Sequence, residues 1–249
     1  MPHEREIIVH IPGKPRVSSS LTDEDVLWRY LDAAKLLDFI HNHTLFFSRG
    51  DQFEDKFEGS FTDSLKHAIE LSYKDNNIDF SYAEFRRRLR ERVFVNCWHQ
   101  SADDSMAMWS IYGRSSCSVA LTTTVGQLRK SLEDQALPHD ISIEKVEYVK
   151  HWRDPELDIA PYSRVFAYKT KAYEFEKEVR ILIDRFSGDF EIPMTDTGML
   201  IKVSSQTLLR SIVIAPEAPP WFETLVRAVS QHYGITVPVR RSFLAKEPV

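Results

Sequence analysis

The chain has 249 residues, of which 43% are hydrophobic and 28% charged, a composition typical of a folded protein and too apolar for a disordered one. Its formal net charge of −5 gives no overall positive field for nucleic-acid phosphates. The two cysteines, Cys97 and Cys117, lack the spacing of a disulfide framework or a zinc site, and no apolar run approaches a membrane span. We therefore expect a folded cytoplasmic protein with no metal and no membrane segment.

Residues 1–20 are expected to form a flexible lead-in, because Pro12, Gly13 and Pro15 interrupt any regular element. Residues 21–249 are expected to form one α+β domain. Its first half predicts a strand over 25–31, a helix over 33–40 and a strand over 44–48. An acidic loop over 51–59 then leads into two helical stretches, which predict a helical insertion at about 60–91.

The second half of the chain is richer in predicted strands than in helices. The strands are expected at 92–98, 118–124, 143–149, 179–184, 199–203, 212–215 and 237–243. Helices are expected around 105–112 and 127–132, and a last one begins at Pro219 and Pro220. Together these elements predict a mixed, largely antiparallel sheet core with flanking helices.

A cluster of charged residues falls at 176–180. If residues 176–183 form one strand, its β-branched residues share one face, which suits the core. Glu176, Glu178 and Arg180 then share the other face. This charged face either lines a cleft or is a solvated surface with a simple Glu–Arg ion pair.

Arg29 lies on the same face of its predicted strand as Leu27 and Leu31. A guanidinium in such a place is costly unless an anion pairs with it. That anion is either a carboxylate of the acidic loop or the phosphates of a ligand.

Two further pairs of residues carry potential chemistry. Cys97 and His99 share a strand face, but their side chains would run parallel, so a core role is favoured over a Cys–His nucleophile. Trp109 and Tyr112 lie one helical turn apart and either stack on a planar ligand or pack in the core. The sequence has no Gly-rich phosphate loop, zinc-protease motif or serine-hydrolase elbow, which disfavours the common nucleotide-binding folds.

Five segments resemble, in order, a bacterial family known as domain of unknown function 2971. They are Leu27-Trp-Arg-Tyr30, Leu45-Phe-Phe-Ser48, Glu54-Asp-Lys-Phe-Glu58, Met108-Trp-Ser-Ile-Tyr112 and Tyr173-Glu-Phe-Glu-Lys-Glu-Val-Arg180. The resemblance covers residues 26–238. The third segment departs from the family's usual Asn-Asp-Pro-Phe-Glu, and the family itself implies no activity.

The layout is also similar to that of ADP-ribosyltransferases of the Arg-Ser-Glu type. It shares an Arg on an early strand, a helix, an aromatic-Ser strand and a late Glu-x-Glu strand. The resemblance implies that NAD is the substrate. The implied contacts to NAD are Arg29, Tyr30, Ser48, Trp109, Tyr112, Arg180 and Glu178.

The same resemblance implies roles for the site residues. Arg29 would contact a phosphate or ribose, Ser48 would support the site, and Trp109 or Tyr112 would stack on nicotinamide. Loss of nicotinamide builds oxocarbenium character at the ribose, which the carboxylate of Glu178 would stabilise. Glu176 would deprotonate the incoming nucleophile.

Three functions follow as hypotheses. The first is an NAD-consuming ADP-ribosyltransferase or NAD glycohydrolase, acting in phage defence or as a toxin on an unidentified macromolecule. The second is a non-enzymatic module that binds a nucleotide or a phage component through Arg29 and the aromatic residues. The third is a metal-dependent nuclease with Asp51, Asp55 and Glu58 as oxygen ligands, which the acidic net charge disfavours.

Overall fold

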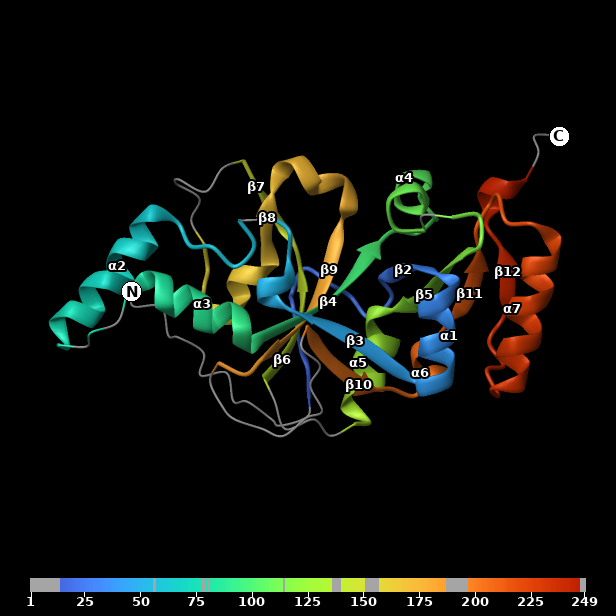
Figure 1. The fold of residues 1–249 in the computed structure, drawn as a ribbon, viewed down its shortest axis with the longest axis horizontal. Coiled ribbons are helices and arrows are strands. Elements are labelled where there is room, and N and C mark those ends of the chain that lie inside the picture. The colour runs from blue at the N-terminus through green and yellow to red at the C-terminus, as the bar shows by residue number, and fades with distance from the viewer. Residues whose placement is uncertain are drawn as a thin grey trace.

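The computed structural model describes residues 14–55, 57–77, 79, 81–113, 115–135, 140–150, 157–186 and 197–246. Ten strands of this part of the chain form one large sheet (Figure 1). Its order is β1 (Arg16–Val17), β6 (Asp140–Lys145), β9 (Glu178–Asp184), β4 (Val93–Gln100), β2 (Val26–Asp32), β5 (Ser118–Thr124), β11 (Ser211–Ile214) and β12 (Val239–Arg241). Strand β3 (Thr44–Arg49) pairs with β4 and with β10 (Gly198–Lys202).

Most pairs in this sheet are antiparallel, and only β1–β6 and β11–β12 are parallel among the described strands. A second, two-stranded parallel sheet joins β7 (Glu147–Val149) to β8 (Tyr168–Thr170). The predicted fold class, an α+β fold with a mixed and largely antiparallel sheet, is therefore confirmed.

Four helices flank the sheet: α1 (Ala33–Asn42), α5 (Val125–Glu133), α6 (Ser205–Leu208) and α7 (Pro220–His232). Helix α1 begins where the Asp32 side chain accepts a hydrogen bond from the backbone N–H of Lys35, at 2.8 Å. It ends at His43, whose φ of 50° is left-handed and directs the chain into β3. These two caps fix how α1 joins β2 to β3.

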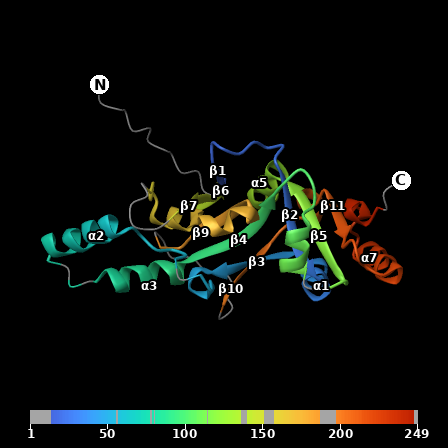
Figure 2. The ribbon, with the colours of Figure 1, turned by 90° about the horizontal axis from the view of Figure 1, so that it is seen from above.

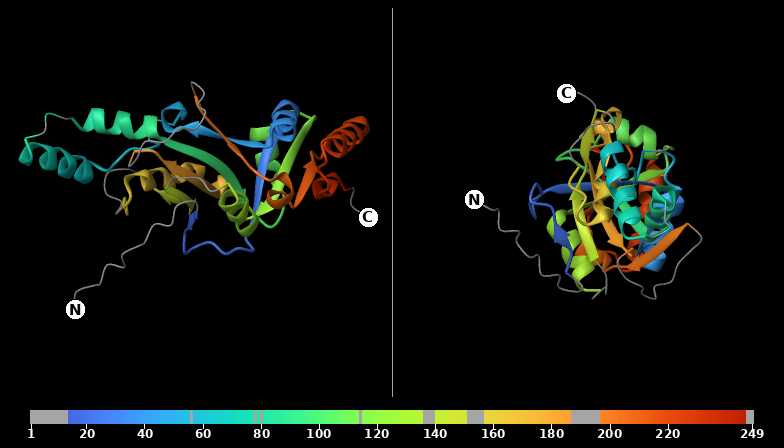
Figure 3. Two further views of the ribbon diagram at one scale, coloured as in Figure 1. Left: turned by 90° about the horizontal axis from the view of Figure 1, so that it is seen from below. Right: turned by 90° about the vertical axis from the view of Figure 1, so that its left-hand side faces the viewer.

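Helices α2 (Asp63–Asp75) and α3 (Tyr82–Arg92) lie in the range where the sequence predicts a helical insertion, and they project from one end of the molecule (Figures 1 and 2). Figure 3 shows this pair at the opposite end of the long axis from α7. The insertion shares a second hydrophobic cluster with β4 and β9, which includes Phe61, Phe85, Leu89, Phe166 and Leu182. Packing against the sheet, and not helix propensity alone, therefore anchors the base of the insertion.

The sheet divides at β4. The first part of β4 pairs with β3, where Ser48 lies opposite Val95, and its last part pairs with β2, where Trp28 lies opposite His99. Between these two registers, β2 and β3 diverge and leave the middle of β4 facing a gap in the hydrogen-bonded sheet. We call this place the fork of the sheet.

Three local predictions differ from the structure. Within the predicted lead-in, Arg16–Val17 form β1 on the large sheet, whereas residues 1–13 lie outside the described residues. The single strand predicted at 143–149 is two strands, β6 and β7, in different sheets. The strand predicted from 176 begins only at Glu178, because Lys171–Glu176 form a 3₁₀ turn and Lys177 has a left-handed φ of 41°. No helix of the described chain is long and apolar enough to cross a membrane.

Candidate functional site

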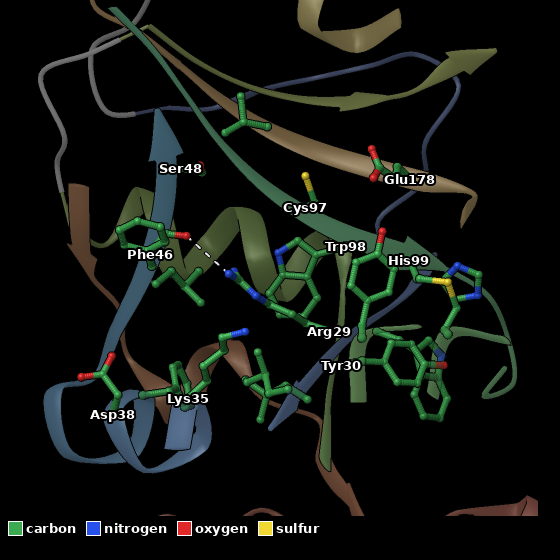
Figure 4. A pocket seen from close by; sticks show the side chains of 18 of the residues that line it. Arg29, Tyr30, Lys35, Asp38, Phe46, Ser48, Cys97, Trp98, His99 and Glu178 are labelled. Atoms are coloured by element: carbon green, nitrogen blue, oxygen red, sulfur yellow. Dashed lines mark hydrogen bonds between the residues drawn. The ribbon is translucent and has the colours of Figure 1, made fainter. Parts of the chain in front are cut away.

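A cavity of about 620 Å³ occupies the fork of the sheet. Figure 4 shows it between β2, β3, β4 and α1, with Glu178 at one edge. Five of the residues that the ADP-ribosyltransferase resemblance implied as contacts to NAD line it: Arg29, Tyr30, Ser48, Tyr112 and Glu178. Arg29 and Glu178, which are 149 positions apart in the sequence, therefore face a common space.

Arg29 is a cation without a carboxylate partner among the described residues. Its Nη2 donates a long hydrogen bond of 3.4 Å to the carbonyl of Phe46, and its Nη1 has no hydrogen-bond partner among the residues that the structure describes. The guanidinium carbon lies 5.9 Å from the ring centre of Trp98. Burial lowers the pKa of Arg29 to about 10, so the group still carries its charge at neutral pH. It therefore provides the cavity with a positive charge that an anionic ligand can neutralise.

The acidic loop does not neutralise Arg29. Asp51 accepts from Arg49 at 2.7 Å, and Glu58 forms a two-bond ion pair with Arg180 at 2.6 and 2.8 Å. The prediction that a carboxylate of this loop pairs with Arg29 is therefore wrong. The other alternative that the sequence left open, the phosphates of a ligand, stays a prediction.

Glu178 is the buried first residue of β9. One carboxylate oxygen accepts from Nε of Arg180 at 2.6 Å, and the other accepts from Nζ of Lys169 at 3.2 Å. Burial alone would raise the pKa of Glu178, but the charges of Arg180 and Lys169 lower it to about 2. The carboxylate is thus anionic at any physiological pH.

Arg180 has no exposed surface and is not part of the cavity lining. Its guanidinium holds Glu58 and Glu178, and its Nη1 also donates to the carbonyl of Phe166 at 2.7 Å. The predicted contact between Arg180 and a cofactor is wrong for this reason. Arg180 instead positions the Glu178 carboxylate from outside the cavity lining. The alternative of a solvated charged face is also wrong, because every residue of β9 is buried.

Glu176 lies beside Glu178, although it does not belong to the same strand as the sequence pattern predicted. It ends the 3₁₀ turn before Lys177, and its carboxylate accepts from the hydroxyl of Tyr112 at 2.7 Å and from Nζ of Lys169. Burial, and then the charge of Glu178, raise the pKa of Glu176. Glu176 itself does not line the cavity, but its partners Tyr112 and Lys169 do. The two glutamates are thus neighbours with pKa values shifted in opposite directions.

Trp109 lies behind the cavity wall. Its ring meets that of Tyr30 edge-on, with centroids 4.8 Å apart and planes at 87°. Tyr30 lines the cavity and Trp109 does not. Core packing, one of the two roles left open for Trp109, is the role observed, and the predicted stacking of Trp109 on a ligand is not supported by this placement.

Cys97 and His99 also line the cavity, but they do not form a nucleophile pair. Burial, and then the charge of Glu178, raise the pKa of the Cys97 thiol to about 12, so it stays protonated. Nδ1 of His99 donates to the backbone carbonyl of Glu176 at 2.6 Å, and burial lowers the pKa of His99. Cys97 is half-buried in the cavity wall, where it packs against the second hydrophobic cluster.

Sequence reasoning missed four polar residues of the cavity lining: Lys35, Asp38, Thr44 and Lys169. Lys169 belongs to β8, a strand of three residues with no alternating pattern to reveal it. Its only sequence signal was a lysine close to a Glu-x-Glu pair. In the structure it joins Glu176 to Glu178, and Glu58 lies 3.9 Å from its Nζ.

The three carboxylates considered for a metal do not converge. Asp51 and Glu58 are held by different arginines, and Asp55 accepts from the backbone N–H of Phe57 at 2.9 Å. In the part of the chain that the structure describes, no group of three or more His, Cys, Asp or Glu residues is arranged to hold a metal ion. The nuclease hypothesis therefore has no metal site among these residues.

The ion network around Glu178 is expected to fail in acid. The carboxylate titrates near pH 4.5 when unfolded and near 2 when folded, so the unfolded chain takes up the proton first as the pH falls. Glu178 thus contributes about 3 kcal/mol to the free energy of unfolding above pH 4.5, and this is lost between pH 4.5 and 2. The raised pKa of Glu176 acts with the opposite sign.

Urea titrations at several pH values check this expectation. The fall in the free energy of unfolding below pH 4.5 should be shallower in Glu178→Gln than in the wild type. An equal fall in the free energy of unfolding of the two proteins below pH 4.5 would contradict the assigned pKa of Glu178.

No protein-family model matches the chain, and no curated protein matches it. Solved structures of DarT from Thermus sp. 2.9 resemble it weakly. The complex with carba-NAD⁺ has a TM-score of 0.42 and 10% identity, and the match covers 90% of this chain and 97% of that one. The complex with ADP-ribosylated ssDNA has a TM-score of 0.41 and 9% identity, with 93% and 98% covered. The NAD⁺ complex has a TM-score of 0.39 and 8% identity, with 89% and 96% covered.

Proposed function

We propose that this protein consumes NAD, with the dinucleotide bound in the cavity at the fork of the sheet and ADP-ribose passed to a target or to water. The observation that supports this proposal is the shared cavity of Arg29 and Glu178. It combines an unneutralised cation with an ionised carboxylate, at a volume typical of cofactor sites. The cavity, and not the weak likeness to DarT, is the basis of the proposal.

In this proposal the charged residues of the cavity contact different parts of NAD. The guanidinium of Arg29 binds the diphosphate, because a fork of N–H donors matches phosphate oxygens. The carboxylate of Glu178 lies against the nicotinamide ribose, and Tyr112 and Lys169 complete that end of the cavity. Ser48 supports the wall on β3.

The chemistry breaks the bond between ribose C1′ and the nicotinamide nitrogen. Nicotinamide leaves with the bonding electron pair, and the ribose acquires oxocarbenium character that the Glu178 carboxylate stabilises. A nucleophile or water then bonds to C1′ and loses a proton. Glu178 is a poor acceptor for that proton because its pKa is about 2, whereas the pKa of Glu176 is raised. Glu176 receives the proton through Tyr112, whose hydroxyl it already holds.

Nicotinamide release from NAD tests the function, with several classes of macromolecule offered as acceptors. Replacing Arg29 with glutamine should raise KM for NAD by about 10- to 100-fold, because a charged hydrogen bond to the diphosphate is lost. Arg210→Gln, an exposed arginine away from the cavity, is the matched control and should leave KM unchanged. A wild-type protein that releases no nicotinamide with any acceptor would refute the proposal.

One observation favours a second candidate, a binding module for a nucleotide or a phage component. Glu178 is already held by two cations and is only 7% exposed, which suits a fixed recognition surface as well as a reacting one. Calorimetry with NAD and a nucleotide panel separates the two functions. Binding that depends on Arg29 without nicotinamide release would favour the module.

The biological setting also belongs to the proposal. An enzyme that depletes NAD or modifies a macromolecule would suit a toxin or a phage-defence protein. Membership in the domain of unknown function 2971 family stays a prediction, since no family model matches the chain.

A further inference from the structure

The cavity continues beyond Arg29 to a second end. Figure 4 shows Lys35 and Asp38 of α1 on the far side of Arg29 from Glu178. This part, which we call the α1–β3 end, is lined by Leu31, Lys35, Asp38, Phe39, Thr44 and Leu200. Its walls are mostly apolar, and its charged groups lie toward the solvent, since Lys35 and Asp38 are exposed.

One buried polar atom of this end has no partner. Thr44 is 8% exposed, and its Oγ1 makes no hydrogen bond within the described part of the chain. Leaving a buried hydroxyl without a partner is unfavourable, so this atom is a candidate contact for a ligand group. The only other side-chain atom of this kind on the cavity lining of the described chain is Nη1 of Arg29. The two residues that carry these atoms thus line the same cavity.

Strand β3 sets the spacing along the cavity. Thr44, Phe46 and Ser48 alternate along β3 and all line the cavity, with Thr44 opposite Lys202 of β10. Four residues of a strand span roughly 13 Å. Because Figure 4 shows Arg29 between Glu178 on one side and Lys35 and Asp38 on the other, we expect a ligand that reaches both ends to be elongated, with its anionic part near Arg29.

We propose that the α1–β3 end binds the adenosine half of NAD, with the Thr44 hydroxyl hydrogen-bonded to the base or its ribose. The apolar walls of Leu31, Phe39 and Leu200 suit the faces of a purine, and the Asp38 carboxylate suits ribose hydroxyls. Identifying the occupant as adenosine rests on the proposed function. That this end binds a largely apolar group that can form a hydrogen bond rests on the geometry of the cavity alone.

Calorimetry with two half-ligands tests this subsite. Adenosine monophosphate probes the α1–β3 end, and nicotinamide mononucleotide probes the Glu178 end. The variant Thr44→Val keeps the shape of the side chain and removes the hydroxyl, whereas Thr44→Ser retains it. We expect Thr44→Val to weaken binding of adenosine monophosphate by about 5- to 10-fold, with nicotinamide mononucleotide unaffected and Thr44→Ser close to wild type.

Two results would overturn the subsite. One is adenosine monophosphate that fails to bind the wild type or binds Thr44→Val equally well. The other is an equal loss of both half-ligands in Thr44→Val, which would indicate a general distortion. The outcome is separate from that of the proposed function. Nicotinamide release with KM unchanged in Thr44→Val would refute the subsite and keep the function, whereas Thr44-dependent binding without any release would do the reverse.

Discussion

Replacing Glu178 with glutamine is expected to lower kcat for nicotinamide release by about 10²- to 10³-fold, with a smaller change in KM for NAD. The amide has nearly the shape of the carboxylate but carries no charge. The lost interaction is stronger in the transition state, where the ribose is positive, than in the ground state. The low pKa of Glu178 means that the charge is present at neutral pH and that its removal is a complete loss.

Glu144→Gln is a matched control for this experiment. Glu144 lies on β6, opposite Arg180 in the β6–β9 register, and is largely buried, but it does not line the cavity. Its substitution should leave kcat unchanged. Thermal unfolding of both variants separates a lost charge from a lost fold. A folded Glu178→Gln protein with wild-type kcat would exclude Glu178 from the chemistry.

Much of the fold could be predicted from local sequence patterns. Alternating apolar residues predicted β2, β4, β5 and β9, and the helical spacing after Tyr82 predicted α3 within an insertion. Local patterns have no information on strand order. That β2 and β3 separate along β4 depends on two registers that pair residues far apart in the sequence. The fork, and with it the cavity, could therefore not be predicted.

The candidate site shows the same division. The cost of burying Arg29 indicated an anion partner, which stays a prediction, and the structure places Arg29 and Glu178 on one cavity. Strand alternation failed at Glu176 because a single left-handed residue, Lys177, ends the pattern, and backbone handedness at a lysine has no sequence signal. The prediction for Arg180 failed for another reason. Its pattern indicated a charged face, but only the three-dimensional pairing with Glu58 shows that this face is buried.

The acidic loop has a different role from the one that the sequence suggested. Glu58 was considered as a metal ligand, and the structure makes it the anchor of Arg180 instead. Because Glu58 lies just before α2, the loop connects the base of the helical insertion to the residue that holds Glu178. Arg180, and at longer range Lys169, thus link this loop to the Glu178 carboxylate.

Replacing Arg180 with methionine is expected to lower the free energy of unfolding by about 3–5 kcal/mol. The substitution removes the two-bond partner of Glu58, which is 2% exposed, and leaves both Glu58 and Glu178 with Lys169 alone, 3.9 Å from Glu58. Removing one partner of a buried ion pair costs more than removing both, because the remaining charge stays desolvated. Urea unfolding at pH 7 measures the change.

The double variant Glu58→Gln with Arg180→Met tests that cause. If the uncompensated charge of Glu58 is responsible, the double variant should be more stable than Arg180→Met alone. Two substitutions with simply additive costs would indicate lost packing instead.

Arg87→Met is the comparison at the surface. Arg87 donates four hydrogen bonds to Glu84 and Glu91, as many as Arg180 donates, but its side chain is 55% exposed. Its loss should leave the unfolding midpoint close to that of the wild type, because water screens and replaces the same contacts. A similar fall for Arg87 and Arg180 would show that burial does not set the strength of the network around Glu178.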